Sequence, residues 1–310
     1  MTECERLIAE GRIPEEFIYP EKRECEVSSE LKKIWALQID LLQQVERICN
    51  AHGLQYYAIC GTALGAFRHH GFIPWDDDVD IALKRKDYNA FLKYAKDELT
   101  EPYFLQAVRS DPYFYRAFAV LRNSNTTCIS AGDEHLKCNN GMMIHIFPLD
   151  GYSGSLRERL FLKIEHVRSA VATNIFCPVG IDSKKGIRIL EKILSPIILF
   201  GGIRRFAERH EKVCTKISEK NYERIGTQFA HFVNLNKVIW KKEWFDSVVM
   251  VPFEFIKIPL PVGYEEMLRV SYKNPMELPP KEKRIYRHSW EMDPDTPYKQ
   301  YCSNKYGVKY

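Results

Sequence analysis

The sequence of 310 residues has no hydrophobic run long enough to cross a membrane as a helix. Such a helix needs about 20 apolar residues, whereas the most apolar stretch, Ile193–Ile203, is short and contains Pro196 and the pair Gly201-Gly202. Lysines and arginines flank this stretch, which leaves two interpretations: a buried segment, or an interfacial hairpin on an anionic membrane surface. The first residues also lack the basic start and apolar stretch of a secretory signal. We therefore expect a cytoplasmic protein, with peripheral contact at the inner face of the membrane as an open alternative.

Cysteine is present without a metal-binding or disulfide pattern. The nine cysteines are an odd number, are scattered from Cys4 to Cys302, and include no C-x-x-C pair. That spacing is typical of structural zinc sites, and closely spaced even numbers of cysteines are typical of secreted disulfide-stabilised domains. The pattern argues against both classes and favours reduced thiols in the cytoplasm.

Basic motifs of nucleic-acid-binding modules are also missing. The 45 lysines and arginines only slightly outnumber the 41 acidic residues, so the formal net charge is +4. They are dispersed and are not interleaved with aromatic residues, so we expect no nucleic-acid partner. This mild positive charge suits an anionic small molecule or an anionic membrane surface instead.

Carboxylates are concentrated in one short segment, Asp76-Asp77-Asp78-Val79-Asp80, which leads into the apolar residues Ile81–Leu83. Read as a strand, this segment places Asp76, Asp78 and Asp80 on one face. Carboxylates spaced roughly 6–7 Å apart on one face repel each other unless a cation lies between them. The segment therefore predicts a site for Mg²⁺ or Mn²⁺. The alternative is a solvated acidic loop before an edge strand.

A second short segment predicts a phosphate site. Tyr56–Cys60 reads as a buried strand, and Gly61-Thr62 reads as a turn that enters a short helix. The first backbone N–H groups of a helix are free to hold phosphate oxygens. A phosphate cradle that faces a metal-binding strand suits transfer of a phosphoryl-type group from a nucleotide.

From Gly61 to Ile81 the chain resembles the LicD/fukutin-related family of phosphocholine and sugar-phosphate transferases. The matching pattern is Gly-Thr, Leu-Gly-Ala, an Arg-His pair, Gly-Phe-Ile-Pro-Trp-Asp-Asp-Asp and an Asp within a hydrophobic strand. Weaker similarities follow at Leu121-Arg122-Asn123, at Ile146–Gly151, at Gly263-Tyr264 and at Leu278–His288.

This resemblance implies an α/β fold, with a nucleotidyltransferase-like mixed β-sheet core flanked by helices and a helical C-terminal region. It also implies an enzyme that moves a phosphate-linked alcohol, such as phosphocholine, from a CDP-linked donor to a hydroxyl of a surface glycan. The acceptor is a lipopolysaccharide or capsule glycan, or its lipid-linked precursor. Two alternatives stay open: a soluble nucleotidyltransferase that acts on a small molecule, and a catalytically impaired nucleotide-binding relative.

The resemblance assigns roles to the residues of the two segments. Asp76, Asp78 and Asp80 are the predicted catalytic metal ligands. Gly61, Thr62 and Arg68 are predicted to grip the phosphates of the donor. Each of these assignments predicts close approach of the two segments in space.

Three further residues are predicted to contact the substrate, and each has an alternative role that involves no substrate. Trp75 is expected to stack on the base or on the choline group through a cation–π contact, or else to be structural. Arg122 and His288 match the family and are predicted to contact phosphate. For these two residues, a solvated arginine and a packed histidine are the alternatives.

The chain departs from the family pattern at His145, where relatives usually carry an Asp between apolar residues. An imidazole titrates near neutral pH and can act as a general base, or it can bind a metal and favour Mn or Zn over Mg. A packed core histidine in a weakened site is the alternative. Asp150 is then the nearest remaining carboxylate, and we expect it to carry part of the role.

Local patterns also predict the organisation of the chain. They indicate helices from Ser28 to Gly53 and from Asp87 to about Leu99, and then strands at 103–108, 115–121 and 126–130. Helical periodicity returns at 156–176 and 187–219. We predict an N-terminal extension (1–27), a nucleotidyltransferase-like core (28–152), a mostly helical insertion or lid (153–250) and a segment that returns to the core as a short strand (251–310).

Overall fold

The structure is a computed structural model that describes residues 1–114, 116–160, 162–164, 203–218, 222–227, 237–285 and 290–310. Its α-helices are α1 (Glu3–Ala9), α2 (Ser29–His52), α3 (Cys60–His69), α4 (Arg85–Glu98), α7 (Ile203–Ser218), α8 (Tyr264–Tyr272) and α9 (Tyr298–Tyr306). Its strands are β1 (Glu21–Lys22), β2 (Glu26–Val27), β3 (Tyr56–Ala58), β4 (Asp80–Lys84), β5 (Tyr103–Gln106), β6 (Ala119–Asn123), β7 (Thr127–Ile129), β8 (Met142–Tyr152), β9 (Arg224–Gly226), β10 (Ile239–Lys241), β11 (Val248–Phe253), β12 (Ile256–Pro261) and β13 (Glu291–Asp293). Short 3₁₀ turns lie at Glu15–Ile18, Lys242–Phe245 and Lys281–Lys283.

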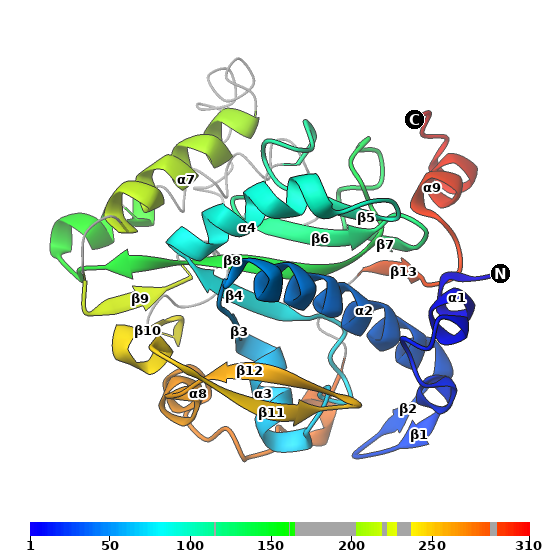
Figure 1. Ribbon diagram of the computed structural model, residues 1–310, viewed down its shortest axis with the longest axis horizontal. Helices are drawn as coiled ribbons and strands as arrows, with labels where there is room; N and C mark the ends of the chain where they lie inside the picture. The colour runs from blue at the N-terminus through cyan, green and yellow to red at the C-terminus, as the bar shows by residue number, and fades with distance from the viewer. Residues whose placement is uncertain (115, 161, 165–202, 219–221, 228–236, 286–289) are drawn as a thin grey trace.

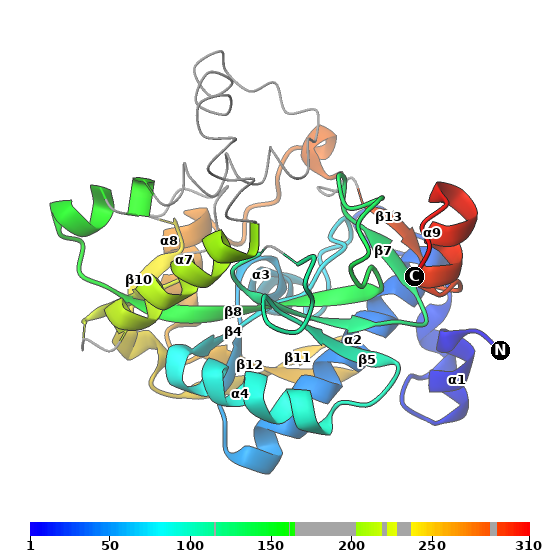
Figure 2. The same ribbon diagram turned by 90° about the horizontal axis from the view of Figure 1, so that it is seen from above.

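A mixed seven-stranded sheet forms the centre of the fold (Figure 1). Its main path runs β10-β9-β8-β4-β3, and β6 joins the other end of β8 and carries β5. Strand β4 is parallel to β8, whereas the other pairs are antiparallel. Helices α2 and α4 lie side by side on one face of this sheet (Figure 2). The predicted mixed α/β class is confirmed.

Helix α2 forms where the sequence predicts it because both of its ends carry local signals. The Ser28 hydroxyl accepts a hydrogen bond from the Leu31 N–H, and Gly53 ends the helix in the left-handed conformation at φ 62°. Between them, an apolar stripe that includes Trp35 and Ile39 is fully buried. The helix therefore packs on β6 and β8 as a rigid support.

The beginning of the chain and its C-terminal part share one core with the sheet. Leu7 and Ile13 of the N-terminal extension are buried in the same cluster as the central strands, and Arg12 pairs with Asp40 of α2. Strands β11 and β12 form a hairpin that packs on β3 and buries Phe253. The predicted return to the core is therefore made by a hairpin and not by a single strand.

Three predicted boundaries differ from the structure. Helix α4 begins at Arg85, before the Asp87 that was expected to cap it, because a buried ion pair between Arg85 and Asp150 fixes its first residue. Strand β4 begins only at Asp80, so Asp76 and Asp78 precede the strand in a segment without regular secondary structure. The strand predicted at 115–121 is observed at 119–123.

The helical region after β8 is described in part. Residues 203–218 form α7, as the periodicity predicts. Nearly all of the apolar stretch Ile193–Ile203 lies outside the described residues. Within the described ranges, no helix combines the length and the apolar character needed to span a bilayer.

Candidate active site

The parallel pairing of β4 and β8 places Asp80 directly beside His145. The Nδ1 atom of His145 lies 3.0 Å from Oδ1 of Asp80 and 3.8 Å from Oδ2 of Asp78. The backbone N–H of His145 donates to the carbonyl of Val79 at 2.9 Å. Sheet pairing therefore brings together two predicted metal ligands and the residue that departs from the family pattern.

A second acidic group adjoins the first. One carboxylate oxygen each from Asp76, Asp77 and Asp78 lie within 4.8 Å of one another, and the same holds for the ligand atoms of Asp78, Asp80 and His145. Asp78 belongs to both groups. Asp77 was not among the predicted ligands, because strict alternation would turn it to the other face. The alternation rule fails here because this segment is not part of a strand.

Hydrogen bonds from two helices hold the backbone of this acidic segment. From α2, Trp35 Nε1–H donates to the carbonyl of Asp76 at 2.9 Å and Gln38 Nε2–H donates to the carbonyl of Asp77 at 2.7 Å. From α3, the Thr62 hydroxyl accepts from the Asp80 N–H at 2.8 Å. Thr62 therefore fixes the first residue of β4.

Gly61 allows the Asp76 carboxylate to lie against the start of α3. A Cβ atom built on Gly61 would lie 2.4 Å from Asp76 Oδ2, closer than real Cβ contacts occur. Gly61 and Thr62 belong to the first turn of this helix, where backbone N–H groups have no intrahelical acceptor. The predicted turn and the acidic segment therefore meet in space at a helix N-terminus, which favours anions.

Cys60 is a further residue of the site that sequence reasoning missed. It takes the left-handed conformation at φ 50°, which is uncommon for a residue with a side chain. Burial raises the pKa of its thiol, and the nearby charges of Asp80, Asp78 and Asp76 raise it further. The thiol is therefore held neutral among the carboxylates. A positive φ carries no clear signal in a sequence, so this placement could not be predicted.

A buried clamp fixes the loop that enters the acidic segment. Glu254, at the tip of the β11–β12 hairpin, accepts from both terminal nitrogens of Arg23 at 2.9 and 2.7 Å and from the Phe72 N–H at 2.9 Å. The Glu254 N–H in turn donates to the carbonyl of His70 at 2.8 Å. A Cβ atom on Gly71 would lie 2.1 Å from Glu254 Oε1, so any side chain here would displace the Glu254 carboxylate from the clamp. The partners are far apart in sequence and gave no local signal.

The donor set fits a divalent cation. Four carboxylates and one imidazole form two overlapping groups of three, and a cation bound among them would offset the repulsion between the carboxylates. An oxygen of Asp76 occupies the space into which a Cβ atom on Gly61 would project. Oxygen ligands suit Mg²⁺ and Mn²⁺, and an imidazole nitrogen shifts the preference toward Mn²⁺.

The ring of His145 is also packed among aromatic side chains. Its centroid lies 5.5 Å from that of Phe118, 5.7 Å from Phe147 and 5.9 Å from Trp290. Its side chain is 12% exposed. The structure is therefore compatible with a role in the site and with a packed core histidine, because aromatic rings surround His145 while its Nδ1 atom faces the acidic group.

Asp150 lies away from the acidic group. It forms a fully buried two-bond pair with Arg85, at 2.7 Å for each bond. It lies five positions after His145 along the extended strand β8, a distance of roughly 17 Å. The expectation that Asp150 shares the role of His145 is not supported by this geometry. Its function here is to neutralise a buried guanidinium.

Arg122 is a buried cross-link and is neither solvated nor open to a phosphate. It has no exposed surface, and its guanidinium donates to Gln106 Oε1 at 2.5 Å and to the carbonyls of Gly141 at 2.6 Å and Cys128 at 3.3 Å. These bonds join β6 to the loop before β8. The structure therefore places Arg122 in the scaffold that supports the site.

Arg68 and Trp75 border the site and contact the C-terminal part of the chain. Arg68 Nη1 donates to the carbonyls of Pro275 at 3.2 Å and Glu277 at 3.1 Å. The Trp75 ring is 6% exposed, and the guanidinium of Arg284 lies 5.6 Å from its centroid. This is a cation–π contact within the protein, which matches the structural alternative. His288 lies outside the described residues.

Comparison with known proteins agrees with this geometry. Residues 53–163, which contain the acidic segment and His145, match the family described as LicD/FKTN/FKRP, nucleotidyltransferase domain. The chain is 25% identical over 256 residues to the lipopolysaccharide cholinephosphotransferase LicD of Haemophilus influenzae, covering 82% of this chain and 94% of that protein. Uncharacterized proteins of Rickettsia prowazekii and Rickettsia typhi are each 38% identical over 47 residues, 15% of this chain. Residues 53–163 therefore form a domain of the LicD/FKTN/FKRP nucleotidyltransferase type, and the chain as a whole is similar to one lipopolysaccharide cholinephosphotransferase.

Proposed function

We propose that this protein is a phosphotransferase that moves a phosphate-linked alcohol, of the phosphocholine type, from a CDP-activated donor to a hydroxyl of a surface glycan or of its lipid-linked precursor. The observation that carries this proposal is the meeting of Asp76, Asp78, Asp80 and His145 at the N-terminus of α3. The cholinephosphotransferase of Haemophilus influenzae, similar over nearly its whole length, supports the choice of reaction.

The acidic group is proposed to hold a divalent cation. Asp76, Asp78 and Asp80 are the proposed ligands, and Asp77 adds a fourth carboxylate beside them. Bound Mg²⁺ or Mn²⁺ would supply positive charge opposite the phosphates of the donor. The N–H groups at the start of α3 would hold phosphate oxygens from the other side.

His145 is proposed to take the proton of the attacking hydroxyl. When its Nδ1–H donates to Asp80, the Nε2 atom carries the lone pair that accepts a proton. Asp80 then holds the imidazole in one orientation, as the carboxylate does in a Ser-His-Asp triad. A ligand role is the competing assignment. His145→Asp would keep or raise Mg²⁺-dependent activity if the residue is a ligand, and would lower it if the residue is the base.

Release of cytidine monophosphate (CMP) tests the reaction. Purified protein is incubated with Mg²⁺ or Mn²⁺ and with CDP-choline, CDP-ethanolamine or CDP-ribitol, together with a glycan acceptor. We expect CMP from one of the donors, and we expect Asp80→Asn to abolish it. Asp97→Asn is the matched control, because Asp97 is exposed on α4 and far from β4 in the chain.

Two other outcomes would overturn the proposal. Pyrophosphate released from CTP and a small phosphorylated alcohol would identify a soluble nucleotidyltransferase. Donor binding without CMP release under any of these conditions would identify a nucleotide-binding relative whose site has lost its activity through the change to His145.

A further inference from the structure

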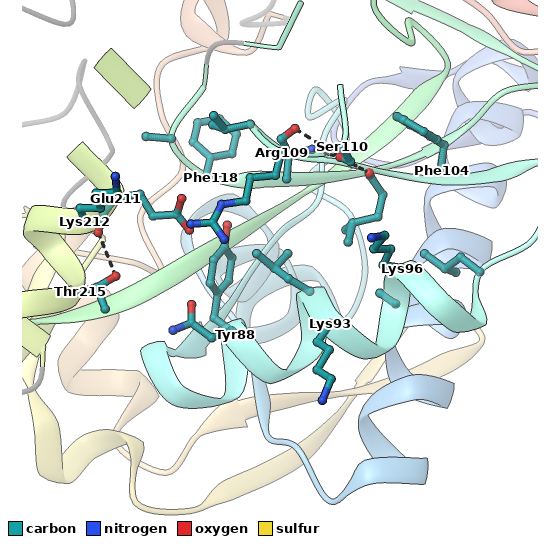
Figure 3. Close-up of a pocket in the computed structure, with 18 of the residues that line it drawn as sticks. Tyr88, Lys93, Lys96, Phe104, Arg109, Ser110, Phe118, Glu211, Lys212 and Thr215 are labelled. Carbon is teal, nitrogen blue, oxygen red and sulfur yellow. Dashed lines mark hydrogen bonds between the residues drawn. The ribbon is translucent and has the colours of Figure 1, made fainter. Parts of the chain in front are cut away.

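A cavity of about 1060 Å³ lies next to the acidic site and takes no part in the metal-binding group. Helix α4 forms one wall, the segment Tyr103–Ser110 forms the second, and the C-terminal half of α7 closes one end (Figure 3). This volume is at the upper end of the range found for sites of small molecules and cofactors. The cavity is large enough for a chain-like ligand.

The interior of the cavity is apolar. Leu92 of α4 and Leu99, which directly follows this helix, line it together with Leu105, Val108 and Ala117. The hydroxyl groups in its walls are bound to the protein. Ser110 Oγ donates to the carbonyl of Leu105 at 2.7 Å, and Thr215 Oγ1 donates to the carbonyl of Glu211 at 2.9 Å. An apolar chain placed here would lose little hydrogen bonding and would gain about 25 cal/mol for each Å² removed from water.

The rim of the cavity is strongly basic. Five cations line it against one carboxylate, that of Glu211, which itself lies 4.0 Å from Arg85. None of the five forms an ion pair with another described residue: Lys93, Lys96, Arg109, Lys212 and Lys216. Figure 3 shows Arg109 reaching across the cavity toward Tyr88 and Glu211. Such a rim attracts an anionic group, and lysine and arginine both suit phosphate.

Phe118 connects the cavity with the surroundings of the acidic site. Phe118 lines the cavity, and its ring centroid lies 5.5 Å from that of His145 and 4.7 Å from that of Phe147. The sheet has a gap at this place. Along one edge of β8, strand β6 pairs with residues 142–146 and strand β9 with residues 150–152. Residues 147–149 pair with β4 on the other edge, but no described strand pairs with them on this edge. A ligand in the cavity would therefore end near His145.

We propose that this cavity is the acceptor subsite and that its ligand is an anionic amphiphile, an acyl or prenyl chain that carries a phosphate. The chain occupies the apolar interior, and the phosphate lies on the basic rim. The role as acceptor subsite rests on the function proposed above, whereas the binding of the amphiphile does not. The hydroxyl to be modified would follow the phosphate and approach His145 past Phe118.

Direct binding of farnesyl phosphate, below the concentration at which it forms micelles, tests the inference without any turnover. We expect saturable binding to the full chain, and at least tenfold weaker binding of farnesol, which lacks the charge, and of inorganic phosphate, which lacks the chain. Lys93→Glu with Lys96→Glu should weaken binding at least tenfold by reversing charge at the rim. Leu92→Trp should do so by filling the interior. Lys86→Glu is the control, because Lys86 is exposed on the same helix outside the cavity.

The outcomes separate this inference from the proposed function. If no CDP-linked donor yields CMP but the variants weaken farnesyl phosphate binding as expected, the lipid site stands and only its role as acceptor subsite is lost. If CMP is released and the variants bind farnesyl phosphate like the wild type, the cavity is not the site. If the charge reversals weaken binding to vesicles of anionic phospholipid and leave farnesyl phosphate binding unchanged, the basic rim is a membrane-facing surface and the inference is overturned.

Discussion

Replacing Gly61 by alanine should damage the proposed metal site while leaving the fold intact. The added Cβ atom would lie 2.4 Å from Asp76 Oδ2, and ordinary contact begins at 3.4 Å, so the carboxylate must move by about 1 Å. Metal-to-ligand distances tolerate deviations of only about 0.2 Å. The far end of a flexible side chain gives way cheaply, so most of the cost should fall on the position of Asp76.

The expected size of the effect follows from this displacement. Loss of a well-placed ligand or of its support weakens metal binding about 10- to 100-fold, which corresponds to about 1.4–2.7 kcal/mol. Alanine favours a helix over glycine by up to about 1 kcal/mol, and Gly61 does not need a positive φ. We therefore expect Gly61→Ala to bind Mn²⁺ 10- to 100-fold more weakly, by electron paramagnetic resonance titration, with an unchanged or slightly higher midpoint of urea unfolding.

Gly65→Ala is the matched control on the same helix. Its Cβ atom would lie 2.5 Å from the backbone oxygen of Gly71 and 3.3 Å from the backbone nitrogen of Ile73, and backbone atoms cannot move away cheaply. This variant should lose about 1–3 kcal/mol of unfolding free energy. Wild-type Mn²⁺ affinity in folded Gly61→Ala would refute the assignment of Asp76 as a ligand. Equal loss of stability in both variants would show that Gly61 is structural.

Three further changes test other parts of the structure. Glu254→Gln should lower the free energy of urea unfolding by about 2 kcal/mol, because it removes the buried one of the two carboxylate partners of Arg23 and leaves only the more exposed Glu21, and it should also weaken Mn²⁺ binding. Asp150→Asn should cost about 3 kcal/mol or more, because Arg85 would stay charged and buried, but the folded fraction should bind Mn²⁺ normally. Burial lowers the pKa of His69 from 6.5 to about 4, so the unfolded chain binds this proton more readily. The free energy of unfolding is therefore unaffected by His69 above pH 6.5, and it falls by at most about 3 kcal/mol as the pH drops toward 4 and the unfolded chain takes up this proton. His69→Asn should remove this part of the pH dependence of urea unfolding.

The controls for these changes lie close by in the chain. Glu265→Gln, at an exposed ion pair on α8, should change stability by less than about 1 kcal/mol. His70→Asn, at the exposed left-handed end of α3, should leave the pH dependence unchanged. A weakened Mn²⁺ site in Asp150→Asn would contradict the separation of this residue from the acidic group. Identical slopes of stability against pH in His69→Asn and the wild type would contradict the burial argument.

The parts of the fold that the sequence could predict are those with local causes. The ends of α2 follow from Ser28 and Gly53, whose effects reach only a few residues. The position of the acidic segment is likewise visible in the sequence as a run of aspartates. Its approach to the Gly61-Thr62 turn could be expected because strand β3 leads directly into α3.

The parts that could not be predicted depend on contacts between distant segments. Asp150 and Arg85 pair across the sheet, and this pair also sets the first residue of α4. Arg23 and Glu254 are 231 residues apart. The placement of Asp77 in the acidic group depends on where β4 begins, which sheet pairing decides and the alternation of residues does not.

The Arg23–Glu254 clamp ties the entrance of the site to a hairpin made late in synthesis. The ribosome completes α3 and the acidic segment long before residue 254 emerges, so the nascent chain carries four neighbouring aspartates without their final support. A cation site formed by these aspartates would gain its final support only when the chain is almost complete. Fragments that stop before the hairpin would hold the recognisable motif of the family and still lack a shaped active centre.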